Sequence, residues 1–537
     1  MTAVIYDPLE EYENKLQALH LENTNAFFQQ LVTKSGVDVE ENRRTVAQYD
    51  KFQESLKKLR RKLGWMRFWR VLMCITLVLI PLVVMKMTPK IRALRKEIEE
   101  GDAKTAELLA KAQRQMEPLN RLFTDRDALE IIHTTVPLMS FHPYFSAEQE
   151  EDMKINYDFR DGNNKEQSTL DVLAGEYNEN PFLFENRRVH KMGMETYHGY
   201  KTITWTETYR DSQGKLQRRT RTQTLHATVT KPKPFYSTQV VLHYCSQGGP
   251  ELSFTRDATN LDQKSERAIE RYVKKGEKKL QRMAEKAVKE NDDFTSMSNT
   301  EFEVLFDALD RTDEVQFRTL FTPLAQTNMV SLLLSQTGYG DDFNFIKEKR
   351  TNTIISQHSQ DRAINLLSGE YPSYSYDNIA QNFVNKNRDF FKAVFFDFAP
   401  LLAIPAYQER PVHSLKPIPD YNRIIAQKEG EAMANMVSEQ YIVHPATKTP
   451  AILKSSFVDS GNNGDEICIT AYSYDIEGRV DIVPMLGGDG RMHNVHVHWD
   501  LYLPLEAKNH FYIAEDSVKD RTLFAKRNGL GIYGSKL

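Results

Sequence analysis

Cysteine is almost absent from this chain, which has only three cysteines among its 537 residues. Three are too few for a disulfide framework, and Cys74 lies inside an apolar run. We therefore expect no structural disulfide between Cys245 and Cys468. A secretory signal peptide is also not expected, because the first 64 residues are polar and charged.

An excess of one charge sign is missing as well. The 70 basic and 74 acidic residues leave a formal charge of −4, so charge gives no overall attraction to nucleic acid. The chain also lacks the motifs G-x-x-x-x-G-K-[ST], G-x-S-x-G, H-E-x-x-H and C-x-x-C. We therefore predict that the protein is not an enzyme, carries no cofactor and does not bind nucleic acid.

One long apolar run, residues 71–85, reads VLMCITLVLIPLVVM. Extended to residues 64–87, it would span about 36 Å as a helix, enough to cross a bilayer. Trp65, Phe68 and Trp69 would then form an aromatic belt at one boundary. We interpret residues 64–87 as one transmembrane helix. A re-entrant hairpin turning near Pro81 and a buried core helix are the alternatives.

Basic residues flank this run on both sides, with eight Lys or Arg in residues 51–70 and six in residues 86–105. Because Lys and Arg accumulate in cytoplasmic flanks, the small excess favours a cytoplasmic N-terminus. We therefore expect a single-pass protein of the cell membrane, with the lipid bilayer as one partner. Two basic flanks also fit a hairpin whose ends both stay in the cytoplasm.

Helical periodicity dominates on both sides of the apolar run. Ser35-Gly36 interrupts an amphipathic pattern that extends from about residue 8 to residue 63, and residues 89–122 predict another charged helix with one apolar face. We predict an α+β fold with N-terminal helices, one hydrophobic membrane segment, a helical stalk, and a mixed head with an antiparallel sheet. The expected boundaries are 1–63 for the N-terminal helical region, 64–87 for the membrane segment, 88–132 for the stalk, 133–410 for the head and 411–537 for a strand-rich C-terminal part.

Alternating residues rich in threonine predict a β-hairpin over residues 202–229. A turn at 211–214 joins its strands, the sequence KPKP at 231–234 ends it, and another strand follows at 237–245. The C-terminal part is also rich in strands, which predicts an antiparallel sheet. We place these strands at 452–458, 466–474, 479–485 and 494–503, with turns at DSGNNGDE, DIEG and LGGDG between them.

His496, His498 and Asp500 are the candidate metal ligands. Alternate residues of a strand share a face, so these three side chains would lie together on one side. Two imidazoles about 6.5 Å apart along a strand can bind one metal ion, with Asp500 as a third ligand or as a hydrogen-bond partner. A polar, solvated strand face is the alternative, and it is favoured because no matching ligand pair is evident elsewhere.

Two further segments have a plain structural interpretation. Residues 261–293 predict a charged helix with ten basic and eight acidic residues, and such mixed signs are typical of a solvated face. Residues 390–404, FFKAVFFDFAPLLAI, are apolar but short and contain Lys392, Asp397 and Pro400. This composition favours a buried core element over a second membrane contact.

Residues 298–323 contain the patterns F-x-V, D-x-V-x-x-R and T-P, carried by Phe302, Val304, Asp313, Val315, Arg318, Thr322 and Pro323. Together with TQTLHATVTKPKPFY at 222–236 and FAPLLAIPAYQ at 398–408, this segment resembles an uncharacterised bacterial membrane-protein family, a domain of unknown function. It is also similar to membrane proteins of mollicutes and related Gram-positive bacteria. The resemblance implies an α+β head anchored by hydrophobic helices near the N-terminus, and it implies no catalytic residues.

Within that segment, the alternation of Phe302 and Val304 predicts an inward-facing strand. Arg318 is placed to pair with Asp313 across a turn. Thr322-Pro323 predicts a strand-to-helix junction, in which the threonine caps the helix that follows.

These features predict a membrane-anchored binding or scaffolding protein. Exposed hairpins accept partner strands and amphipathic helices pair, so a protein partner is expected on the N-terminal helices or on the 202–229 hairpin. Two alternatives stay open. One is a metal-binding protein or metal-dependent enzyme that uses His496, His498 and Asp500, and the other is an accessory subunit of a membrane transport or secretion assembly. The sequence predicts no oligomeric state.

Overall fold

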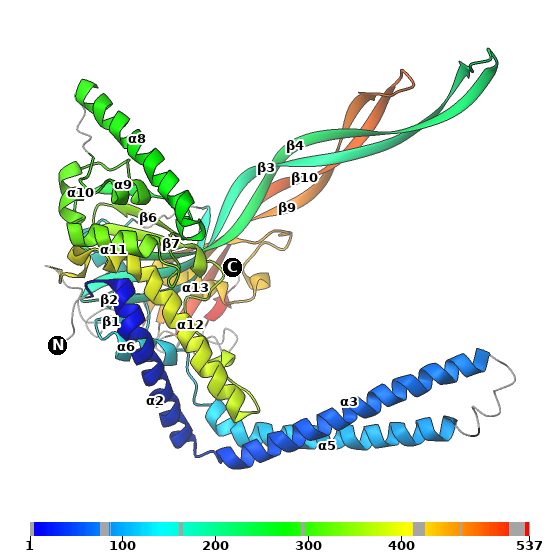
Figure 1. The fold of residues 1–537 in the computed structure, drawn as a ribbon, viewed down its shortest axis with the longest axis horizontal. Coiled ribbons are helices and arrows are strands. Elements are labelled where there is room, and N and C mark those ends of the chain that lie inside the picture. Colours follow the sequence, from blue (N-terminus) through cyan, green and yellow to red (C-terminus); the bar gives the residue numbers. More distant parts are fainter. Residues whose placement is uncertain are drawn as a thin grey trace.

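The computed structural model describes residues 5–75, 85, 87–160, 165–290, 296–411, 425–461, 464–514 and 532–535. The fold of this part is α+β, as predicted, and its strands pair in antiparallel sheets. Two long arms project from a central body (Figure 1). One arm is the helical hairpin of α3 (Val39–Ile75) and α5 (Thr88–Asn120), and the other consists of the β3/β4 and β9/β10 hairpins.

A seven-stranded sheet forms the middle of the body, with the strand order β1-β2-β3-β4-β7-β6-β5. Only the inner ends of β3 and β4 pair with other strands, since β2 reaches Val189 and β7 begins its pairing at Leu242. Beyond these points the two strands pair only with each other and leave the sheet as a ribbon. The strands are β1 (Met139–Phe141), β2 (Gln167–Tyr177), β3 (Asn180–Arg210), β4 (Leu216–Cys245), β5 (Ser253–Arg256), β6 (Phe343–Glu348) and β7 (Thr351–Ser356).

Side chains alternate between the two faces along each strand, so both faces of this sheet carry apolar residues. Helices cover both faces. Phe182 and Phe184 face the large core, whereas Leu183 and Cys245 face a smaller cluster on the other side. The large core is shared with α2 (Gln17–Ser35), α6 (Asp127–Thr135), α9 (Thr300–Phe306), α10 (Glu314–Leu320), α11 (Pro323–Leu333) and α12 (Tyr376–Leu402). The smaller cluster is shared with α7 (Ala147–Tyr157) and α13 (Gln427–Asn435).

A second sheet has the order β11-β10-β9-β8 and packs on the far side of α13. Ala432 of that helix faces the first sheet, and Met433 and Ala434 face the second, so α13 joins the two. The strands are β8 (Ile452–Gly461), β9 (Gly464–Leu486), β10 (Met492–Ala514) and β11 (Ile532–Ser535). These strands confirm the antiparallel sheet expected near the C-terminus.

The N-terminal helices divide between the body and an arm. After the short α1 (Pro8–Glu11), α2 ends at Ser35, and Gly36 adopts a φ of 64°, a conformation that favours glycine. The predicted break is therefore confirmed. α2 packs against α6 and α12 and buries Phe28 and Leu31, so only α3 projects from the body.

The predicted single-pass membrane protein is wrong. α3 carries only the first five residues of the apolar run, 71–75, behind a strongly charged stretch. Residues 76–84 and 86 of the expected membrane segment lie outside the described residues. Of the helices that the structure describes, none is long and apolar enough to cross a membrane. The inferred orientation of the N-terminus has no basis without that span.

Two expected strand ends are also wrong. The sequence DIEG at 475–478 makes no turn, because β9 continues through it and pairs with residues 500–503 of β10. KPKP at 231–234 lies inside β4, where Pro232 and Pro234 lie opposite Met194 and Met192. An edge strand tolerates proline where the N–H would point away from its partner, and prolines two residues apart share that orientation.

The 298–323 segment is helical rather than extended. Phe302 and Val304 are buried, as expected, but they lie in α9 and not on a strand. Asn299 caps this helix by accepting the N–H of Phe302 at 3.1 Å. The helical cap therefore outweighs the short alternating pattern, which a helix accommodates just as well over three residues.

The rest of that segment follows the prediction in part. Asp313 caps α10 by accepting the N–H of Gln316, whereas Arg318 donates to the backbone carbonyl of Ser296, so the expected pair of Asp313 with Arg318 is replaced by two separate contacts. Thr322 accepts the N–H of Ala325 and Pro323 begins α11, which confirms the predicted cap. The junction joins two helices and not a strand to a helix.

Candidate functional site: the two projecting arms

A narrow apolar seam holds the helical arm together. Leucine and methionine residues recur along α3 at spacings of three and four, so they share one face of the helix. The seam consists of Leu56, Leu59, Leu63 and Met66 of α3 and Ile91, Leu94 and Ile98 of α5. Gly101 continues it, and a Cβ atom there would lie 2.5 Å from Cδ2 of Leu56. Glycine thus permits the close approach of the two helices.

The base of the helical arm is fixed to the body by polar contacts. Asn42 is fully buried, and its Nδ2 donates to the carbonyl of Tyr374 at 3.0 Å while its Oδ1 accepts the N–H of Tyr376 at 3.0 Å. Next to it, Arg43 donates to Asp377 at 2.9 Å. The arm is joined in this way to the start of α12, which sets its direction.

Toward the outer end of α3, three aromatic side chains lie exposed beside one another. Trp65, Phe68 and Trp69 are 64%, 59% and 44% exposed, and Phe68 packs edge-on against both tryptophans with centroid distances of 6.2 and 6.1 Å. Residues 56–70 also contain seven Lys or Arg and no Asp or Glu. This part of the arm is therefore aromatic and strongly cationic.

The β arm consists of two ribbons packed face to face (Figure 1). Their inner faces bury Ile203 and Leu225 of the β3/β4 ribbon against Val495 and Val497 of β10. At the crossing lies Gly199, where a Cβ atom would be 2.4 Å from the backbone oxygen of His496. The ribbons therefore meet at a contact that only glycine allows.

A cation also joins the two ribbons. Lys231 of β4 places its Nζ 2.7 Å from Oδ2 of Asp481 and 4.3 Å from the ring centre of Trp499. The indole N–H of Trp499 donates to the same carboxylate at 2.9 Å. These contacts lower the pKa of Asp481, first through the hydrogen bond from Lys231 and then through that from Trp499.

The three predicted metal ligands lie on the outer face of β10, as the alternation predicts. His496 and His498 are exposed, and Asp500 is partly exposed. Within the described parts of the chain, no group of three or more His, Cys, Asp or Glu side chains is arranged to hold a metal ion. The three side chains share one face of the strand, but they do not form a cluster that could hold a metal ion.

Apolar side chains surround these histidines. The register pairs His496 with Ile482 and His498 with Val480, so all four side chains share the outer face. Ile482 is 56% exposed, and the same face carries three other exposed apolar residues, Val480, Leu486 and Met492. This patch is not predictable from the sequence, because the alternation of residues 479–485 does not say which face the neighbouring ribbon covers.

The outer face of the β3/β4 ribbon carries paired polar side chains, together with the exposed side chains of Met192, Met194 and Tyr200. Cross-strand threonines are paired on it with oxygen distances of 3.2 Å, in the pairs Thr196–Thr230, Thr202–Thr224 and Thr204–Thr222. His198 and His226 stack on the same face, with Nδ1 of one 2.9 Å from Nε2 of the other. Threonine combines a high strand propensity with a polar group, so these pairs suit a solvated strand face.

Charged groups are buried where the β arm joins the body. Glu185 of β3 accepts hydrogen bonds from Lys428 at 2.9 Å and from Thr169 at 2.7 Å, and His243 lies 3.7 Å away. In the same layer, Lys454 of β8 donates to Glu431 of α13 at 3.0 Å. These groups connect α13 to both sheets and so fix the base of the arm.

Comparison of the chain with protein-family models, with curated proteins and with solved structures finds no match. The resemblance to a bacterial membrane-protein family stays a prediction.

Proposed function

We propose that this protein is a binding scaffold that holds protein partners on its two arms. The observation that carries the proposal is the cluster of Trp65, Phe68 and Trp69, which stays exposed although it lies on a well-packed helical hairpin. Tryptophan and arginine are the residues that most often dominate binding energy at protein interfaces. Three adjacent exposed aromatic side chains form a patch that a partner can bury.

The charge around this patch specifies the kind of partner. Seven cations and no acidic residue in residues 56–70 favour a partner surface that is acidic and carries apolar side chains. Arg60 already pairs with Asp102 at 2.7 Å, but both side chains are about half exposed, so this contact is weak. The remaining cations steer an acidic partner toward the aromatic cluster.

The β arm offers a second surface of a different character. Its patch of Val480, Ile482, Leu486 and Met492 is apolar and lies on one face of a ribbon whose other face is buried. Because each arm is fixed at its base, by Asn42 in one case and by the Glu185 network in the other, two partners bound to the arms would be held at a defined separation. This is what a scaffold requires.

The test is site-specific photo-crosslinking in cells that make the full chain. p-Benzoylphenylalanine at position 65 should crosslink to a discrete protein with an acidic surface. The matched control is the same probe at Val315, which is 74% exposed on the body and should give no such product. Changing Phe68→Ser and Trp69→Ser should remove the product. Equal crosslinking from both positions, or a product that survives the serine substitutions, would contradict the proposal.

A further inference from the structure

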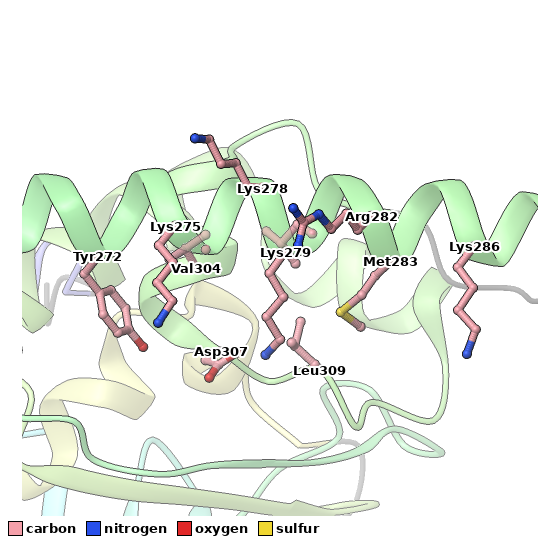
Figure 2. Close-up of a pocket in the computed structure, with 12 residues that line it drawn as sticks. Tyr272, Lys275, Lys278, Lys279, Arg282, Met283, Lys286, Val304, Asp307 and Leu309 are labelled. Atoms are coloured by element: carbon pink, nitrogen blue, oxygen red, sulfur yellow. The ribbon is translucent and has the colours of Figure 1, made fainter.

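A groove runs along the inner side of α8 (Glu266–Glu290), which projects from the body apart from the helical arm (Figure 1). It encloses a cavity of about 700 Å³ between α8 and the residues around the end of α9. Lys275, Lys279 and Met283 point from α8 toward Asp307 and Leu309, which lie opposite (Figure 2). The groove is therefore walled by a cationic helix on one side and by a loop on the other.

The cations of this wall form a row. Lys275, Lys279, Arg282 and Lys286 follow at spacings of four, three and four residues, which places them on one face of α8 over about 16 Å. Lys275, Lys279 and Arg282 form no salt bridge with any residue that the structure describes. The mixed charge signs of this helix predict a solvated face, but its acidic residues lie mainly on other sides of the helix.

The floor of the groove is apolar. Gly276 lies directly on Val304, because a Cβ atom at this glycine would be 2.3 Å from Cγ1 of Val304. The two helices are in contact at this point. Val304, Leu309 and Met283 line the adjoining cavity. Asp307 is the acidic group on this wall, and burial raises its pKa while Lys279 and Arg256 oppose that effect.

We propose that this groove binds an acidic amphipathic helix of a partner protein. Carboxylates spaced i, i+4, i+7 and i+11 on such a helix would match the row of cations, and its apolar residues would cover Val304, Leu309 and Met283. The length of the row favours this occupant, since a single small anion would engage only one or two of the four cations. The inference does not depend on the proposed role of the arms.

The test uses the full chain and a fluorescein-labelled synthetic helix. The probe has glutamates at i, i+4, i+7 and i+11 and leucines one position after each, and its anisotropy is measured at low and high salt. Wild-type protein should bind it, less tightly at high salt. K279E and K286E together should weaken binding by about tenfold or more, because attraction at two positions becomes repulsion.

The control is Lys274→Glu, which reverses one charge on an exposed part of α8 that does not line the groove. It should change the affinity less than about twofold, with circular dichroism confirming that each variant keeps its helix content. Three results would overturn the proposal: no binding to wild type, equal loss with K274E, or displacement of the probe by inorganic triphosphate alone, which would make the groove a small-anion site.

Discussion

The Nζ atom of Lys428 lies 2.9 Å from Oε2 of Glu185, and both side chains are buried between the seven-stranded sheet and α13. Burial alone would raise the pKa of Glu185, but the charge of Lys428 and its hydrogen bond hold that pKa well below its usual range. The pair therefore attaches α13, and through it the second sheet, as long as the carboxyl group is ionised. Its stabilising effect is present at neutral pH and is lost as the pH falls through the lowered pKa.

Removing one member of this pair should be costly. Lys428→Met leaves Glu185 buried without its lysine partner, with Thr169 and His243 beside it, and we expect the free energy of unfolding to fall by about 3–5 kcal/mol. Urea denaturation at pH 7 measures the change. The control is Lys448→Met, because Lys448 pairs with Asp475 at the surface and should contribute less than about 1 kcal/mol. Similar losses in the two variants would contradict the role given to burial.

His20 should make the protein sensitive to mild acid. The ring is stacked on Phe391 at 4.1 Å, Nε2 lies 3.2 Å from the carbonyl of Asn387, and burial lowers the pKa of this histidine to about 4. An unfolded chain takes up this proton near pH 6.5, so the free energy of unfolding should fall as the pH drops from about 6.5 to 4, by about 3 kcal/mol. Urea denaturation of wild type and His20→Gln across this range gives the free energy of unfolding at each pH. The difference between the two slopes against pH is the contribution of His20. Parallel pH profiles would show that His20 does not titrate as expected.

A methyl group added at Gly101 should destabilise the packing of α3 against α5 in the helical arm. Alanine normally stabilises a helix relative to glycine by about 1 kcal/mol, but at this position Leu56 must move to make room. We expect Gly101→Ala to speed hydrogen exchange of the amides in α3 and α5. The matched control is Gly64→Ala, since no atom lies within 4 Å of a Cβ atom there. That variant should slow exchange, and equal effects from both would argue against close packing at Leu56.

The contact where the two ribbons cross should be just as sensitive to an added methyl group. In Gly199→Ala the new methyl group meets the backbone oxygen of His496, which cannot turn aside as a side chain can. We expect the ribbons to separate, with faster exchange in residues 473–500 and a loss of about 1–3 kcal/mol. Gly478→Ala, in β9, has no atom within 4 Å and should leave exchange nearly unchanged. Equal protection of these amides from hydrogen exchange in the two variants would contradict this contact.

Local signals account for the parts of the fold that were predicted correctly. The turn at 211–214 exists because Asp211 accepts the N–H groups of Gln213 and Lys215 and because Gly214 takes a φ of 79°. The break at Gly36 and the cap at Thr322 likewise depend on residues within a few positions of each other. Such features involve no distant partner, so the sequence alone is sufficient.

The errors have other causes. DIEG has the composition of a turn, yet Asp475 accepts from Lys448 at 2.8 Å and the strand continues beside β10. Phe302 and Val304 alternate over too short a stretch to distinguish a helix from a strand. Partners distant in the sequence decide the structure at DIEG, whereas the cap at Asn299 decides it at Phe302 and Val304.

The sequence by itself determined the α+β composition, the main turns and helices, and the face of β10 that His496 and His498 share. Only the tertiary structure decided that the hairpins project as arms, that Val480 and Ile482 lie on an exposed face, and that the cations of α8 border a groove. The physical reason is that hydrogen-bonded turns and helical periods are local, whereas exposure depends on which surfaces the rest of the chain covers.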